Sequence, residues 1–218
     1  MFPVVCFWVT LGGIRETSRW SPRYSFLAGR MDASVPDDAL LVRRCLKGDG
    51  QAIGALVERF QAEVFGLCVR LLQNRHDAED VSQEVFLRIF RSLRRWDRKR
   101  PLRPWIMGIA VNRCRTWLGQ RARRPELVEY LQETAVSRPE DDSAELVREI
   151  QAALGQLRVE YRTVFVMFHQ QNHPYEDIAE ALDKPVGTIK TWLHRARLEM
   201  LEHLRRRGMI SELEHEVP

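Results

Sequence analysis

The stretch that decides the fold of this chain is Tyr175–Arg197, "YEDIAEALDKPVGTIKTWLHRAR". Apolar residues recur in it with helical spacing on both sides of the pair Asp183-Lys184, whose residue types suit a tight turn. Pro185 follows this pair, and proline is favoured in the first turn of a helix because its missing N–H needs no partner there. The pattern predicts two short helices that cross at a tight turn, a helix-turn-helix.

The second helix, expected from about Pro185 to Arg207, has two chemically different sides. Its inner side carries Ile189, Leu193 and Ala196. The outer side is small and basic, and it carries Gly187, Thr188, Lys190, Thr191, His194 and Arg195, with Arg197 beside them. Such a side suits the major groove of DNA, although a basic surface helix of a bundle would show the same composition.

The rest of the chain is also patterned as helices, because strand-like alternation is nearly absent and the apolar period is close to 3.6. The expected helices cover about 37–47, a stripe from Ile53 to Leu71, a segment capped by Asn74 or Asp77, a segment from about Pro104, and then 144–157, 160–170, 174–182 and 185–207. We therefore predict an all-α fold.

Between these helices, residues 121–143 have no periodicity and indicate a flexible linker. The predicted organisation is two small helical domains, 34–120 and 144–207, with a tail at 208–218. The first 33 residues are expected to be disordered or mis-assigned, with Met31 as an alternative start. Their apolar run "MFPVVCFWVTLGG" is too short for a membrane span and lacks the basic residues of a secretion signal.

Charge is unevenly distributed in this chain of 218 residues, whose formal net charge is +4. Basic residues dominate from Arg88 to Arg124, where Asp97 is the single acid. From Pro125 to Val147 the sign reverses, and Arg138 is the single basic residue. The basic block suits a polyanion such as nucleic acid, and the acidic linker can compete for the same surface.

Several classes of protein are disfavoured by the residue patterns. The four cysteines, Cys6, Cys45, Cys68 and Cys114, form no CxxC pair, so we expect small buried thiols and no zinc site or disulfide framework. No phosphate-binding glycine loop, metal cluster or nucleophile–base spacing is present, so we expect no enzyme and no cofactor.

The two halves resemble a known family. Residues 157–204, including "LRVEYRTVFVMF" and "PVGTIKTWLHRARLEML", resemble region four of bacterial RNA polymerase sigma factors, which reads the −35 promoter element. This resemblance implies that the outer side of the last helix contacts −35 DNA. The implied residues are Lys190, Thr191, His194, Arg195 and Arg197, with Gly187 and Thr188 at the start of the helix. Trp192 stands where the family usually has arginine.

The N-terminal half resembles region two of the same family through "DAEDVSQEVFLRIF", residues 77–90. In that family this helix docks on the β′ clamp helices of core polymerase, which implies a core-binding patch of Asp80, Gln83, Glu84 and Phe86. The basic loop and the helix after it match the segment that reads the −10 element. The implied −10 residues are Arg98, Lys99, Arg100, Arg103, Asn112 and Arg113.

Because residues 37–120 and 143–207 match and no other sigma region has room, the chain resembles the extracytoplasmic-function group. The resemblance implies a cytoplasmic initiation subunit without membrane insertion. Its implied partners are core RNA polymerase, through the β′ clamp helices and the β flap, and promoter DNA, with an anti-sigma factor as a further candidate. The alternative is a free-standing helix-turn-helix regulator whose N-terminal half serves for dimerisation or sensing.

Overall fold

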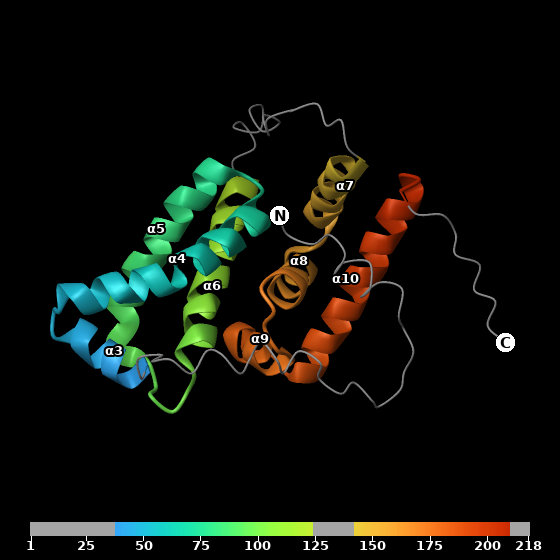
Figure 1. Cartoon of the computed structure of the whole chain (residues 1–218). Coiled ribbons are helices and arrows are strands. Elements are labelled where there is room, and N and C mark those ends of the chain that lie inside the picture. Colours follow the sequence, from blue (N-terminus) through green and yellow to red (C-terminus); the bar gives the residue numbers. More distant parts are fainter. Residues whose placement is uncertain (1–37, 124–141, 210–218) are drawn as a thin grey trace.

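A computed structural model describes residues 38–123 and 142–209, and every regular element in these two ranges is helical (Figure 1). The elements are α3 (Asp38–Leu46), α4 (Gly50–Leu72), α5 (Arg75–Ser92), a 3₁₀ turn (Leu93–Arg95), α6 (Leu102–Ala122), α7 (Asp142–Gln156), α8 (Val159–Phe165), a π turn (Val166–Gln170), α9 (Tyr175–Leu182) and α10 (Val186–Arg206). This confirms the all-α prediction. The expected N-terminal extension, residues 124–141 of the linker and residues 210–218 of the tail lie outside the described ranges.

Helices α3 to α6 form the N-terminal module. The predicted stripe of α4 is its core, with Leu56, Val64 and Leu67 fully buried. Helix α5 begins after Asn74, whose side-chain oxygen accepts a hydrogen bond from the N–H of Asp77 at 3.0 Å. The cap is therefore Asn74, one of the two candidates, and it satisfies an N–H that the first helical turn leaves without a partner.

Helices α7 to α10 form the C-terminal module, which contains the predicted helix-turn-helix. Asp183 adopts a left-handed conformation with φ of 51°, and the N–H of Lys184 donates to the carbonyl oxygen of Ala179 at 3.0 Å. This ends α9 and turns the chain into α10. Ile189 and Leu193 are buried against the module, so the predicted inner side of α10 is confirmed.

The two modules pack directly against each other, with α9 on α6 and α8 on α4 (Figure 1). The contact is closest at Gly108 of α6, where a Cβ atom would lie 2.7 Å from the carbonyl oxygen of Ala181. Arg162 of α8 is 8% exposed and donates to the carbonyl oxygen of Leu71 on α4 at 2.8 Å. Nothing in the sequence pattern indicated this interface.

Candidate nucleic-acid interface

The outer side of α10 is open to solvent, as the sequence predicts. Gly187, Lys190, Thr191, His194 and Arg195 are exposed, and Thr188 is half-buried. The hydroxyl of Thr191 donates to the carbonyl oxygen of Gly187 at 2.9 Å, and the ammonium of Lys190 lies 5.5 Å from the centre of the Tyr175 ring. These contacts hold two of the side chains on one surface of the helix-turn-helix.

The basic residues nearer the middle of α10 are held by α8 and the π turn. Arg195 donates to the hydroxyl of Tyr161 at 3.1 Å. Arg197 donates to Nε2 of His169 at 3.1 Å, and its guanidinium lies 5.6 Å from the centre of the Phe168 ring. Arg197 is half-buried, so it also joins α10 to the π turn.

Trp192, at the position where the resembling family usually has arginine, is half-buried and packs against the hydrophobic core. Packing therefore occupies the position at which a phosphate contact would otherwise be expected. Its place on the side of α10, between the buried row and the exposed row, explains why a large apolar residue is tolerated there.

The basic loop before α6 is a compact turn. The side chain of Asp97 accepts a hydrogen bond from the N–H of Lys99 at 3.0 Å, and its carbonyl oxygen accepts one from the N–H of Arg100 at 2.9 Å. Arg98, Lys99 and Arg100 are exposed, and the guanidinium of Arg100 lies 4.0 Å from Glu180 on α9. The single acid of the basic block therefore shapes the loop that presents these cations.

The remaining residues expected at the −10 element lie in different surroundings. Asn112 is exposed on α6. Arg113 is buried and pairs with Glu84 of α5 at 2.5 Å, and Arg103 pairs with Glu63 of α4 at 2.8 Å. The hydrogen bond from Arg113 lowers the pKa of Glu84. In this state both arginines are engaged within the protein.

The expected core-binding patch lies on the outer side of α5, where Asp80 and Gln83 are exposed and Glu84 and Phe86 are half-buried. The sequence reading missed Leu87, whose side chain is 55% exposed. Its spacing of seven residues from Asp80 places it on the same side of the helix. That spacing, with an apolar residue in a polar row, was the signal that could have identified it.

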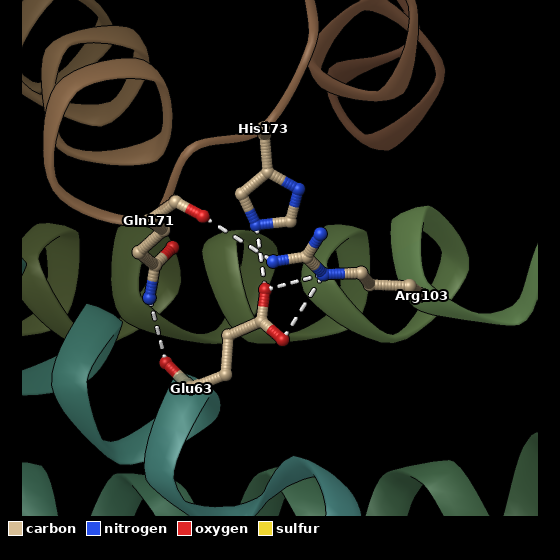
Figure 2. A network of polar contacts seen from close by, with 4 residues as sticks. All are labelled: Glu63, Arg103, Gln171 and His173. Carbon is tan, nitrogen blue, oxygen red and sulfur yellow. Dashed lines mark hydrogen bonds and ion pairs between the residues drawn. The ribbon is translucent and has the colours of Figure 1, made fainter. Parts of the chain in front are cut away.

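A polar network joins the two modules and was also missed (Figure 2). Glu63 of α4 lies at its centre, and its carboxylate contacts Nε2 of His173 at 2.7 Å and the guanidinium of Arg103 at 2.8 Å. Gln171 donates to the carbonyl oxygen of Glu63 at 2.8 Å and accepts a bond from Arg103 at 3.3 Å. From the sequence, His173 was considered only as an imperfect cap for α9. In the structure its side chain is buried against α4 instead.

The ionisation of Glu63 follows from this network. Burial alone raises the pKa of a carboxyl group, but the contacts from His173 and Arg103 outweigh burial, so the pKa of Glu63 lies below its ordinary value. Glu63 is therefore a carboxylate at neutral pH, and it is compensated from both sides of the module boundary.

Three of the four cysteines lie in the described residues, and all three are free and buried. The thiols of Cys68 and Cys114 lie 3.6 Å apart, and this contact together with burial raises the pKa of Cys114. Within residues 38–123 and 142–209, no helix has the length and apolar character to cross a membrane. In the same ranges, no group of three or more His, Cys, Asp or Glu side chains could hold a metal ion.

Comparison with known families matches both halves of the chain. Residues 56–124 match the family model described as Sigma-70 region 2, and residues 147–200 match the one described as Sigma-70, region 4. The chain is 35% identical to the ECF RNA polymerase sigma-E factor of Haemophilus influenzae, with 76% of this chain and 94% of that one covered.

Two solved structures share the fold. One, described as CnrH in complex with the cytosolic domain of CnrY, has a TM-score of 0.60 and 24% identity and covers 78% of this chain and 99% of that one. The other, described as the sigma factor RpoE in complex with the anti-sigma factor NepR from Bartonella quintana, has a TM-score of 0.58 and 19% identity. It covers 70% of this chain and 96% of that one.

Proposed function

Because the chain belongs to the extracytoplasmic-function (ECF) RNA polymerase sigma factors, we propose that its two modules divide the work of promoter recognition between them. The chain is a sigma factor that directs promoter-specific initiation of transcription, which excludes the alternative of a free-standing regulator. The observation that carries this conclusion is the presence of both sigma regions in one chain, which aligns with 94% of a sigma-E factor.

The C-terminal module, proposed as residues 144–207, is assigned to the −35 element. Its support is the exposed side of α10, where Lys190, Thr191, His194 and Arg195 share one surface. Side chains of these types can reach base edges and phosphates when a recognition helix enters the major groove. Gly187 and Thr188 at the start of α10 allow the backbone to approach a phosphate, and Arg197 is assigned to the DNA backbone.

The N-terminal module, proposed as residues 34–120, is assigned to the −10 element and to core polymerase. Exposed cations in the loop supply phosphate attraction, and Asn112 supplies an amide that can bond to a base. Arg103 and Arg113 remain candidates, but each would first have to leave its carboxylate partner.

The core-binding surface is proposed as the outer side of α5, with Asp80, Gln83, Glu84 and Phe86 facing the β′ clamp helices. Leu87 is added here because an exposed apolar side chain among polar ones is the usual anchor of a protein interface. The β flap is proposed to contact the C-terminal module.

Several properties follow from this assignment as proposals. The protein acts in the cytoplasm by binding, and it catalyses no reaction and needs no cofactor. An anti-sigma factor is a further proposed partner, since a solved structure of the same fold is described as a complex with one.

Run-off transcription tests the function. The full chain is mixed with bacterial core RNA polymerase and genomic DNA of its own bacterium, and the 5′ ends of the transcripts are mapped. We expect a discrete set of start sites that core alone does not produce. A protein that binds specific duplex DNA tightly alone but never associates with core would contradict the assignment.

The double substitution Asp80→Arg with Gln83→Ala separates core binding from folding in the same assay. Both side chains are exposed, so the helical circular-dichroism spectrum should not change. Capture of core polymerase and all specific start sites should be lost. Undiminished capture of core would remove the α5 assignment.

A further inference from the structure

One side of α6 is covered by the helix-turn-helix. Trp105, Ile109 and Asn112 follow one another at helical spacing on this side, and they line a cavity of about 210 Å³. Glu180 and Ala181 of α9 close the opposite wall of the same cavity. A nucleic-acid strand cannot lie along this side of α6 while α9 is in contact with it.

The contact is also incompatible with simultaneous binding of two promoter elements. The elements are named by base-pair position, so their centres lie about 25 base pairs, or about 85 Å, apart on B-form DNA. Two modules in contact at Gly108 and Ala181 cannot both reach their elements. The chain between Arg123 and Asp142 can extend to at most about 65 Å, so together with the width of the modules it permits their separation.

We propose that the interface of α4 and α6 with α8 and α9 is an autoinhibitory contact that covers the −10 surface of the free protein and opens before promoter binding. This inference rests on the proposed −10 function of α6 and the loop before it. The interface is a reversible kind of contact, because its polar groups can be solvated once the modules separate.

The network around Glu63 is the latch of this closed state (Figure 2). It joins a carboxylate of α4, a guanidinium of α6 and an imidazole from the segment before α9. Because Arg103 is one of the proposed −10 residues, the closed state both covers the surface and engages one of its cations. A second such cation, Arg100, lies beside Glu180 of α9.

Gly108 makes the close approach of the two helices possible. Any other side chain at this position would place its Cβ against the backbone of α9, which cannot move without displacing the helix-turn-helix. The outer side of α5 carries the proposed core-binding residues, and α6 lies between α5 and α9 (Figure 1). The closed form can therefore still bind core polymerase, which would make opening a step that follows core binding.

The experiment compares Gly108→Ala with Gly119→Ala in the full-length protein. Both substitutions add one methyl group to α6 and raise its helix propensity, but nothing lies within 4 Å of the added methyl at Gly119. Fluorophores placed by genetically encoded amino acids at the exposed positions Arg91 and Arg205 report the distance between the modules.

For Gly108→Ala we expect loss of energy transfer and an increase of about tenfold or more in the open fraction. We also expect a matching gain in affinity for a single-stranded oligonucleotide that carries a −10 element mapped by run-off transcription, without core polymerase. Gly119→Ala should behave as the wild type. Unchanged energy transfer in Gly108→Ala would overturn the closed state itself.

Opening without any gain in affinity for the oligonucleotide would overturn the inhibitory role and would count against the −10 assignment, while discrete start sites in run-off transcription would still stand. Glu63→Gln keeps the shape of the side chain and removes its charge, so it should open the protein as well. If Glu63→Gln and the double variant Glu63→Gln with His173→Gln open to equal extents, the two residues act as one latch. Additive opening would exclude that coupling.

Discussion

His169 lies in the π turn that follows α8, where its ring lies 4.6 Å from that of Phe165 between ring centres. Burial and the positive charge of Arg197 lower the pKa of His169 from 6.5 to about 4. The imidazole is therefore neutral at pH 7, and its Nε2 can accept the hydrogen bond from Arg197. A single side chain thus holds one of the proposed DNA-binding arginines against α8.

This ionisation predicts a pH-dependent stability. The unfolded chain binds a proton at His169 below about pH 6.5 and the folded chain only below about pH 4, so stability is complete above pH 6.5 and falls between these values. Between pH 7 and pH 5 the loss should be about 2 kcal/mol. Urea unfolding of the wild type and of His169→Gln measures it. Equal pH dependence in the two proteins would contradict the pKa.

At the scale of elements, α10 combines two tasks on one helix. Its buried row, which includes Ile189, Leu193 and Met200, fixes its position against α7 to α9. Its exposed row is presented at the N-terminal half, directly after the turn at Asp183. A recognition helix needs this arrangement because its N-terminal residues are the ones that contact base edges.

Basic residues at the two ends of α10 should therefore differ in effect. Lys190→Ala should lower transcription from −35-dependent start sites by about tenfold, because the loss of a base or phosphate contact costs about 1–3 kcal/mol. Arg205→Ala removes an equally exposed cation near the other end of the helix and should change it little. The readout is run-off transcript yield at limiting protein. Equal losses for both variants would indicate only a general effect of charge.

At the scale of the whole molecule, the described helices form two modules that pack together, while the chain between them is long enough to let them separate. Three features oppose separation: the close contact at Gly108, the network around Glu63, and the bonds that Arg162 of α8 makes to α4. Binding of two elements about 85 Å apart on DNA requires separation. Linker length should therefore limit activity.

Deletion of residues 128–137 shortens the reach of the linker by about 35 Å. We expect capture of core polymerase to be retained and transcription from promoters that need both elements to be lost. Replacement of the same ten residues by a sequence of equal length and charge is the control and should restore transcription. Transcription by the shortened protein at wild-type yield would show that the modules need not separate to that extent.

Local pattern was sufficient for much of this protein. The helix-turn-helix, the cap at Asn74, the buried row of α10 and its exposed basic side each depend on neighbours within a few residues, so spacing and residue type predict them. The start of α6 at Leu102, just before the expected Pro104, differs by only two residues. The family itself also follows from two local motifs in one chain.

Tertiary structure alone decided what joins the modules. Gln171 and Glu63 are 108 residues apart, and no periodicity relates them or reveals that a histidine before α9 will be buried against α4. The need for glycine at position 108 likewise comes from a backbone oxygen on another module. Helical spacing reports which side of an element is apolar, whereas the pairing of two surfaces depends on shape and charge that meet only after folding.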